Sequence, residues 1–494
     1  MPSYLCISFR FLQPLSHGRG DDGEPQWPPS PLRVYQALVA ASAARWNERA
    51  RLDHAASALK WLERQSNPVI VAAPGRRAGV KYRLYVPDNV ADKVASSWAR
   101  GGVASIADYR TEKDVCPVYV DGDAVHYLFP VADSEIELET HQQLLALAAR
   151  SVTHLGWGID MVVANAEIIT QEQADSLHGE RWQPVEDSHG LGLRVPVEGT
   201  LDALIRRHEA FLNRLGSDGF KPVPPLSAFR VVGYRRATEP AMRHWVAFKL
   251  LKPDATGTRA FEIARRTREV AGMVRCGVAA TAKRHGWCVE RINVFVHGKS
   301  LNGSQPARGE ESPDRFIYLP LPTINHALRR VESIRRVLIA APAHCQQEIS
   351  WARRAMAGEL LTSEIGNDAA ILSPLPNSDW VLGKYVGWSD TWSTVTPVIL
   401  PRHEGYAPAE ADEQVKLAFE QAGYSRDLLR DADLSWRRVG FLAGTDLASR
   451  YLPPEKLMHK PRYHVRVRFP HPISGPVVVG AGRFRGFGLF AVDD

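Results

Sequence analysis

The amino-acid sequence predicts an α+β fold built in two parts. Strand-like and helix-like runs alternate along the whole chain and are not separated into blocks. In the back half the predicted order is strand, helix, strand, strand, helix, strand, which is that of a ferredoxin-like βαββαβ unit. A chain of 494 residues exceeds the roughly 100–200 residues of an ordinary domain, so two or three domains are expected.

The front half opens with a predicted strand over 4–11 and a turn-rich stretch over 17–29. A helix follows, because Ser30 suits the N-cap, Pro31 suits the first helical position and apolar residues then recur at helical spacing. Further elements are expected as strands at 80–86 and 125–129 and as helices at about 141–154 and 200–215.

The segment KPVPPL, residues 221–226, is the predicted linker. Its three prolines fit neither a helix interior nor a central strand. The expected domains are therefore 1–220 and 226–494.

The back half restarts with a predicted strand at about 244–251 and a long helix within 258–285. Strands at 289–296 and 315–319, a short helix at 325–331 and a strand at 333–340 complete the βαββαβ order. A second, similar unit is expected over 380–494, with helices at about 410–422 and 425–431.

Composition and charge restrict the classes of function. With 45% hydrophobic and 23% charged residues, the chain is typical of a globular protein. Five scattered cysteines without CxxC spacing argue against a disulfide framework and a zinc site, and no run approaches the roughly 20 apolar residues of a membrane span. A cytoplasmic protein without a membrane partner is expected.

The charge is distributed unequally between the halves. Residues 1–225 carry 23 Lys and Arg against 28 Asp and Glu, a net charge of −5; the remainder has 61 − 23 = 38 against 55 − 28 = 27, a net charge of +11. A polyanion is therefore expected to bind the back half, although a basic but inert surface is the alternative.

Two elements of the back half present basic residues on one face. At helical spacing Arg265, Arg268 and Arg275 form a stripe together with Lys283. In the strand-like HVRVRF run, His464, Arg466 and Arg468 alternate with apolar residues. Both faces are candidate RNA contacts, and a solvated outer face is the alternative for each.

The C-terminal run GPVVVGAGRFRGFGLF interleaves glycine, arginine and phenylalanine. Its glycines let the backbone approach a ligand, and its arginines supply charge. The predicted RNA-binding residues of this glycine-rich loop are Gly480, Gly482, Arg483, Arg485, Gly486 and Gly488. A dinucleotide-binding fingerprint is rejected because Arg485 stands where the third glycine would be required.

Histidines in the basic half are the candidate catalytic groups, since no HExxH, GxSxG or paired-carboxylate motif occurs. His297 and Lys299 follow a predicted strand in HGKSLNG, and His326 follows another. A histidine of near-neutral pKa can exchange a proton with a ribose 2′-hydroxyl, and a lysine can stabilise charge on phosphate. This chemistry requires no metal or cofactor, and His285 and His17 are rival histidines.

Four segments resemble one known family: GDDGEPQWPPSPLRVYQALVA (20–40), RFIYLPLPTI (315–324), WSTVTPVILPRH (392–403) and GPVVVGAGRFRGFGLF (475–490). They are similar to the CRISPR-associated fusion subunit of type I-G systems, formerly called I-U. The resemblance runs nearly end to end. It implies a front part like the backbone subunit that holds the 5′ handle of the guide RNA, and a back part like the repeat-specific endoribonuclease, both built of ferredoxin-like, RRM-like modules.

The resemblance further implies cleavage of CRISPR precursor RNA within each repeat, by 2′-hydroxyl attack that leaves a cyclic phosphate, with the mature guide RNA retained. The implied partners are the backbone filament and large subunits of the type I-G effector complex and, indirectly, target DNA. A catalytically silent RNA-binding subunit is the alternative, and a metabolic enzyme with a basic lobe is a second. In the front half, Trp27 and Arg33 are candidate RNA contacts, although Trp27 between prolines also suits a packing role.

Overall fold

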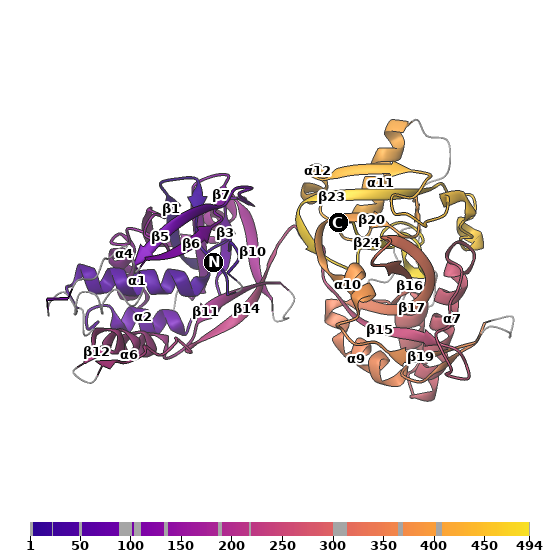
Figure 1. Ribbon diagram of the computed structural model, residues 1–494, viewed down its shortest axis with the longest axis horizontal. Coiled ribbons are helices and arrows are strands. Elements are labelled where there is room, and N and C mark those ends of the chain that lie inside the picture. Colours follow the sequence, from indigo (N-terminus) through magenta and orange to yellow (C-terminus); the bar gives the residue numbers. More distant parts are fainter. Residues whose placement is uncertain are drawn as a thin grey trace. The chain divides into compact units, whose positions relative to one another are not determined.

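The computed structural model describes residues 3–21, 23–48, 52–87, 101–102, 110–132, 137–185, 190–216, 219–299, 314–363, 369–401 and 408–493. Helices and strands are mixed throughout, which confirms the α+β class (Figure 1). The chain divides into two compact units, Met1–Ala237 and Thr238–Asp494. No helix in the described residues is long and apolar enough to cross a membrane.

The first unit is built on a seven-stranded sheet in the order β11-β14-β10-β3-β8-β1-β9. Its strands are β1 (Ser3–Phe11), β3 (Val69–Ala72), β8 (Ala124–Val131), β9 (Val162–Thr170), β10 (Glu180–Val185), β11 (Leu191–Pro196) and β14 (Phe229–Arg236). Its helices are α1 (Pro31–Arg45), α2 (Ala56–Glu63), α4 (Leu138–Ala149), α5 (Gln171–Ser176) and α6 (Thr200–Leu212). A three-stranded sheet has the order β2 (Leu15–Ser16), β7 (Val118–Val120), β4 (Gly75–Arg77). Two further strand pairs are β5 (Tyr82–Pro87) with β6 (Arg110–Val115) and β12 (Leu215–Gly216) with β13 (Gly219–Phe220).

Helix α1 forms as its sequence predicts. Ser30 Oγ accepts a hydrogen bond from the Arg33 backbone amide, and Pro31 opens the helix. Tyr35 and Leu38 are buried in the same core cluster as Ile7 and Phe9 of β1. The first unit does not end at the predicted linker, however, because β14 lies beyond 221–226 and pairs with both β10 and β11.

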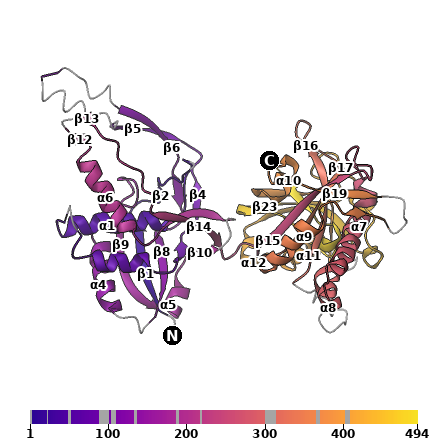
Figure 2. The same ribbon diagram turned by 90° about the horizontal axis from the view of Figure 1, so that it is seen from below.

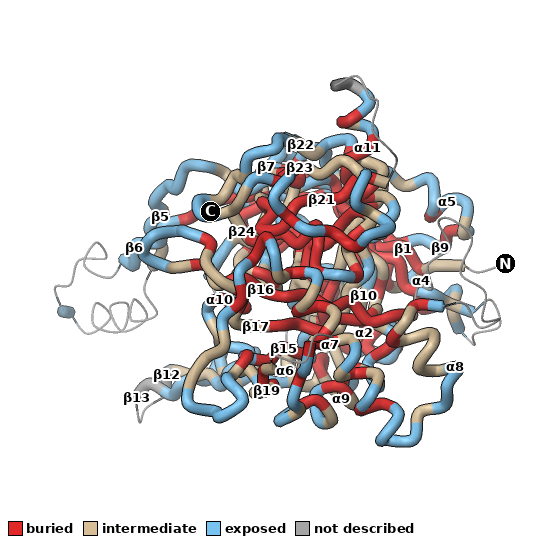
Figure 3. The backbone as a smooth tube through the Cα atoms, turned by 90° about the vertical axis from the view of Figure 1, so that its right-hand side faces the viewer, coloured by how far each residue is buried: buried red, intermediate tan, exposed pale blue. Residues whose placement is uncertain are grey.

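The second unit contains a five-stranded antiparallel sheet in the order β16-β17-β15-β19-β18. Its elements are β15 (Arg243–Leu251), α7 (Ile263–Arg284), β16 (Ile317–Asn325), β17 (Arg330–Pro342), α9 (Gln346–Ala355), β18 (Leu360–Leu361) and β19 (Ala370–Pro374). Helix α7 packs on β16 and β17, and α9 packs on β15 and β17 (Figure 2). Strands β16 and β17 run through the buried interior (Figure 3), as their burial patterns require.

Two predicted elements of this region were wrong. The segment expected as a strand at 289–296 is helical, forming α8 (Val289–Arg291) and a π-helix (Ile292–His297), because its apolar residues pack on the core from a helical turn. The helix expected at 325–331 does not form, because these residues are the end of β16, the tight turn 326–329 and the start of β17. There the Asn325 side chain accepts hydrogen bonds from the amides of Ala327 and Leu328, which stabilises a turn instead.

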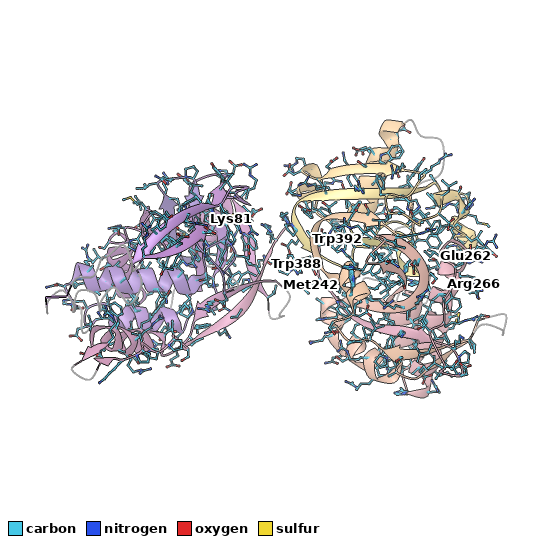
Figure 4. All side chains as sticks on the ribbon, in the orientation of Figure 1. Lys81, Met242, Glu262, Arg266, Trp388 and Trp392 are labelled. Atoms are coloured by element: carbon cyan, nitrogen blue, oxygen red, sulfur yellow. The ribbon has the colours of Figure 1, made fainter. Side chains whose placement is uncertain are left out.

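A second sheet in this unit has the order β21-β23-β20-β24, with β22 also paired to β23. Its elements are α10 (Trp380–Val386), β20 (Trp388–Thr394), β21 (Val398–Ile399), α11 (Pro408–Glu420), α12 (Arg426–Arg430), β22 (Asp433–Arg437), β23 (Arg462–Ser474) and β24 (Phe490–Val492). Trp392 is fully buried in its core, whereas Trp388, on the same strand, is 46% exposed (Figure 4). The glycine-rich loop connects β23 to β24.

Candidate nucleic-acid site

The glycines of the glycine-rich loop are buried against the protein itself. A Cβ at Gly486 would lie 2.7 Å from Pro320 Cδ and 2.9 Å from Thr267 Cγ2, and a Cβ at Gly480 would lie 2.7 Å from the Ile399 carbonyl oxygen. The structure therefore gives Gly480, Gly482, Gly486 and Gly488 a role in packing, and their contact with RNA stays a prediction. Their missing side chains let the loop pack closely on β16 and α7.

This packing brings two arginines onto one aromatic ring. The 3₁₀ turn Arg483–Arg485 carries Phe484, whose ring has the Arg315 guanidinium carbon at 3.8 Å and that of Arg483 at 4.5 Å. Cation–π contacts of this kind hold guanidinium groups in a fixed orientation. Arg485, the next residue, is exposed.

A second glycine brings the HGK segment to the same arginine. Gly298 ends the π-helix with φ +68°, and a Cβ there would lie 2.3 Å from Arg315 Cζ. The residue after Arg315 is fixed as well, because the Phe316 amide donates to the Phe295 carbonyl at 2.8 Å. Arg315 is therefore packed between the Gly298 turn and Phe484. Ser300–Gly303, the rest of the predicted loop, lie outside the described residues.

His297 is a half-buried histidine in a positive environment. Burial lowers its pKa below the ordinary value, and the charges of Arg275, Lys299 and Arg315 lower it further. Its imidazole is thus neutral at pH 7 and can accept a proton, while three cations around it can hold an anionic group. Sequence patterns singled out His297, Lys299 and Arg275 separately, and the structure brings them together.

The other two arginines of the predicted stripe, Arg265 and Arg268, lie nearer the start of α7 than Arg275 and are exposed. Arg265 Nε lies 3.7 Å from the Glu262 carboxylate. The Arg268 guanidinium donates to the Pro453 carbonyl at 3.0 Å. Both lie in the first turns of α7, where Glu262 and Arg266 mark the helix start in Figure 4. Their role as RNA contacts stays a prediction.

His326 does not join this cluster. His326 follows the last residue of β16, and Arg315 lies just before the first residue of the same strand. Because a nine-residue strand spans roughly 30 Å, the two residues lie far apart. Its ring packs edge-to-face on Trp380 at 4.7 Å. His326 and His297 therefore cannot act on the same phosphate, which corrects the predicted grouping of these two histidines with Lys299. The rival His285 caps α7 and packs on Trp351.

The HVRVRF strand corresponds to part of β23, and its polar face is largely neutralised. Arg466 pairs with Asp493 at 2.5 Å, and Arg468 lies 4.0 Å from Asp390. His464 is fully buried, so the prediction that it contacts RNA was wrong. Its Nε2 donates to the Asp446 carbonyl at 3.0 Å, and its Nδ1 lies 3.1 Å from Thr394 Oγ1, which suits a neutral ring.

His464 makes the folded protein sensitive to acid. Burial lowers its pKa to about 4 from 6.5, so the unfolded chain binds the proton more tightly than the folded one. We expect the full free energy of unfolding above about pH 6.5. It should fall by about 3 kcal/mol as the pH drops to about 4, since one pKa unit corresponds to about 1.4 kcal/mol. Urea unfolding across this range measures the slope, and His464→Gln, which cannot titrate, should flatten it. An equal slope in that variant would assign the effect to other groups.

The two candidate contacts in the first unit are structural. Trp27 is 8% exposed, donates from Nε1 to the Ala73 carbonyl at 2.8 Å and packs on Phe11. Arg33 is partly buried, which lowers its pKa, and its guanidinium donates to the Arg19 carbonyl at 2.8 Å. Folding already uses both side chains, and the RNA contacts of Trp27 and Arg33 stay a prediction.

Sequence reasoning missed two residues of the cluster formed by His297, Arg275, Lys299, Arg315 and Phe484. Arg315 and Phe484 are 8% and 9% exposed, and their importance depends on a contact between segments far apart in the chain. The available signal was that Arg315 begins one distinctive segment and Phe484 lies in another. Their pairing could not be read from either segment alone.

Comparison with known proteins bears on this site. A family model described as CRISPR-associated protein, GSU0054 family, matches residues 7–492, which include every residue of the cluster. No curated protein matches the chain. Because the model covers nearly the whole length, the chain belongs to the GSU0054 family of CRISPR-associated proteins.

Proposed function

We propose that this protein is an endoribonuclease that cuts CRISPR repeat RNA without a metal and keeps its product. The observation that carries the proposal is the position of His297, a half-buried histidine of lowered pKa beside Arg275, Lys299 and Arg315. A neutral base near several cations suits phosphodiester cleavage by an internal hydroxyl.

In the proposed reaction, His297 takes the proton from a ribose 2′-hydroxyl. The 2′-oxygen attacks the adjacent phosphorus, and the bond to the 5′-oxygen of the next nucleotide breaks. The products are a 2′,3′-cyclic phosphate and, after protonation of the leaving oxygen, a free 5′-hydroxyl. Lys299, which is exposed, and Arg315 would stabilise the charge that builds on the phosphate oxygens.

The wider RNA surface is proposed from the charge of the back half, +11 over residues 226–494. Exposed Arg485 and the exposed arginines of α7, Arg265 and Arg268, are the proposed contacts that retain the cut RNA. The first unit is proposed to hold the 5′ handle of the guide RNA within the type I-G effector complex, next to its filament and large subunits.

Strand order supports tandem ferredoxin-like modules as the scaffold. Around β15 the order β16-β17-β15-β19 places the first strand between the third and the fourth, as a βαββαβ unit requires. The orders β22-β23-β20-β24 and β3-β8-β1-β9 follow the same scheme. RNA-binding RRM-type sheets share this topology, which makes the fold suitable for the proposed substrate.

The decisive test is incubation of the purified protein with its own labelled repeat RNA in the presence of EDTA, with a 2′-deoxy substitution scanned along the RNA. We expect a single cut that persists with the chelator and disappears when one deoxy position replaces the attacking hydroxyl. Tight binding without a cut would instead leave a structural guide-RNA subunit. Absence of binding would exclude both.

A further inference from the structure

A cluster of metal-ligand side chains lies at the end of the β16–β17 hairpin. The two strands are antiparallel with Ile317 opposite Ala340, so the residues before β16 lie beside those after β17. Asp314 precedes β16, and the 3₁₀ turn Ala343–Cys345 follows β17. The hairpin therefore places Asp314 next to His344 and Cys345, although thirty positions separate Asp314 from His344 in the sequence.

One ligand atom from each residue lies within 4.8 Å of the other two. Asp314 Oδ1 is 2.6 Å from His344 Nε2. Ligands at about 2.0–2.3 Å from a tetrahedral zinc ion are roughly 3.3–3.8 Å from one another. The three side chains therefore need only small rotations to share one ion, and the exposed His344 can make them without a change in the core.

We propose that Asp314, His344 and Cys345 bind a zinc-class divalent cation, with water completing a four-coordinate site. The donor set is a carboxylate oxygen, an imidazole nitrogen and a thiol sulfur, a combination that suits Zn²⁺ and not the oxygen-preferring Mg²⁺ or Ca²⁺. CxxC spacing could not reveal this site, because its ligands come from two separate segments of the chain.

The surroundings fit such a site. Cys345 is 2% exposed and belongs to the main core cluster, which limits the access of water to the sulfur. Glu348, in the first turn of α9, accepts a hydrogen bond from the Arg291 guanidinium at 2.6 Å and so does not compete for the ion. Without a metal, the Asp314–His344 pair would be an ordinary exposed ion pair of little energetic value, its side chains 43% and 63% exposed.

Bound metal would also affect the neighbouring site. Asp314 is bonded through the backbone to Arg315, whose guanidinium lies on Phe484. Fixing the Asp314 side chain would hold the start of β16 in place, and no step of the proposed cleavage passes through the ion.

Cobalt binding tests the proposal without reference to RNA. The full-length protein, stripped with a chelator, is titrated with Co²⁺, which reports a thiolate ligand by a sulfur-to-metal charge-transfer band and tetrahedral geometry by its visible spectrum. We expect one equivalent to bind and to be displaced by Zn²⁺. Cys345→Ser should abolish the charge-transfer band, and Cys276→Ser, which changes an exposed cysteine outside the cluster, should retain it.

His344→Ala guards against misfolding of the Cys345 variant, because the His344 side chain is 63% exposed and its loss leaves the core intact. We expect its Co²⁺ affinity to fall by at least about tenfold. Absence of the band in the unmodified protein, or an unchanged band in Cys345→Ser, would overturn the proposal. Either result would leave the proposed RNA cleavage unaffected, since metal binding is the only quantity measured.

Discussion

Replacing His297 by alanine is expected to slow RNA cleavage by at least about 100-fold, because a general base of this kind typically contributes 10²- to 10⁴-fold to the rate. Binding of the repeat RNA should change little, since the surrounding cations Arg275, Lys299 and Arg315 remain. Single-turnover cleavage of labelled RNA measures the rate, and a filter-binding titration measures affinity at the same salt concentration.

His326→Ala is the matched control. His326 is exposed and lies at the opposite end of β16, so its loss should leave the cleavage rate unchanged. The reverse pattern, with normal cleavage in His297→Ala and loss in His326→Ala, would move the reaction away from the proposed cluster. Melting temperatures of both variants separate a chemical effect from a folding defect.

The pH dependence of the rate provides a separate check on His297. The proposed base acts in its neutral form, so the rate should rise as the pH passes through the pKa of His297 and then level off. Burial and three nearby cations lower that pKa below 6.5, which places the rise on the acid side of the ordinary histidine value. A profile that rises only well above pH 7 would indicate a different base.

Local sequence signals were sufficient for the elements that depend on local interactions. The cap at Ser30 and the apolar spacing of α1 and α7 predicted helices that the structure contains. The mixed α+β class was confirmed, but two of the predicted positions in the back half were wrong. A β-branched run after α7 became helical because its packing on the core outweighed strand propensity, and α9 took the helical place assigned to 325–331.

The site was less predictable than the elements, because it depends on contacts across the chain. His297, Lys299 and Arg275 carry recognisable chemistry, so sequence reasoning could nominate them. Their association through Arg315 and Phe484 requires the fold of three separated segments. His464 shows the converse error: alternation correctly placed its neighbours on strand faces, yet it cannot show that Asp446 and Thr394 bury this ring.

The glycine-rich loop leads to the largest expected change in stability. Gly488 has φ +66°, and a Cβ there would lie 1.8 Å from the Val479 carbonyl oxygen, a backbone atom that no side-chain rotation can move away. The two residues are also joined by a hydrogen bond from the Val479 amide to the Gly488 carbonyl at 3.0 Å. We therefore expect Gly488→Ala to lower the free energy of unfolding by about 3 kcal/mol or more, measured by urea titration.

Gly286→Ala separates backbone strain from the steric clash. Gly286 has φ +76° in the same unit, but a Cβ there would meet nothing within 4 Å, so only the left-handed conformation is penalised, at about 1–2 kcal/mol. A larger loss in Gly488→Ala than in Gly286→Ala would identify close packing as the reason for glycine. A shift of the loop that relieves the clash in Gly488→Ala would also move Phe484 away from Arg315 and reduce cleavage. If Gly488→Ala were instead as stable as the unmodified protein but failed to bind RNA, the loop would be a direct RNA contact, because only a ligand could then require the absent side chain.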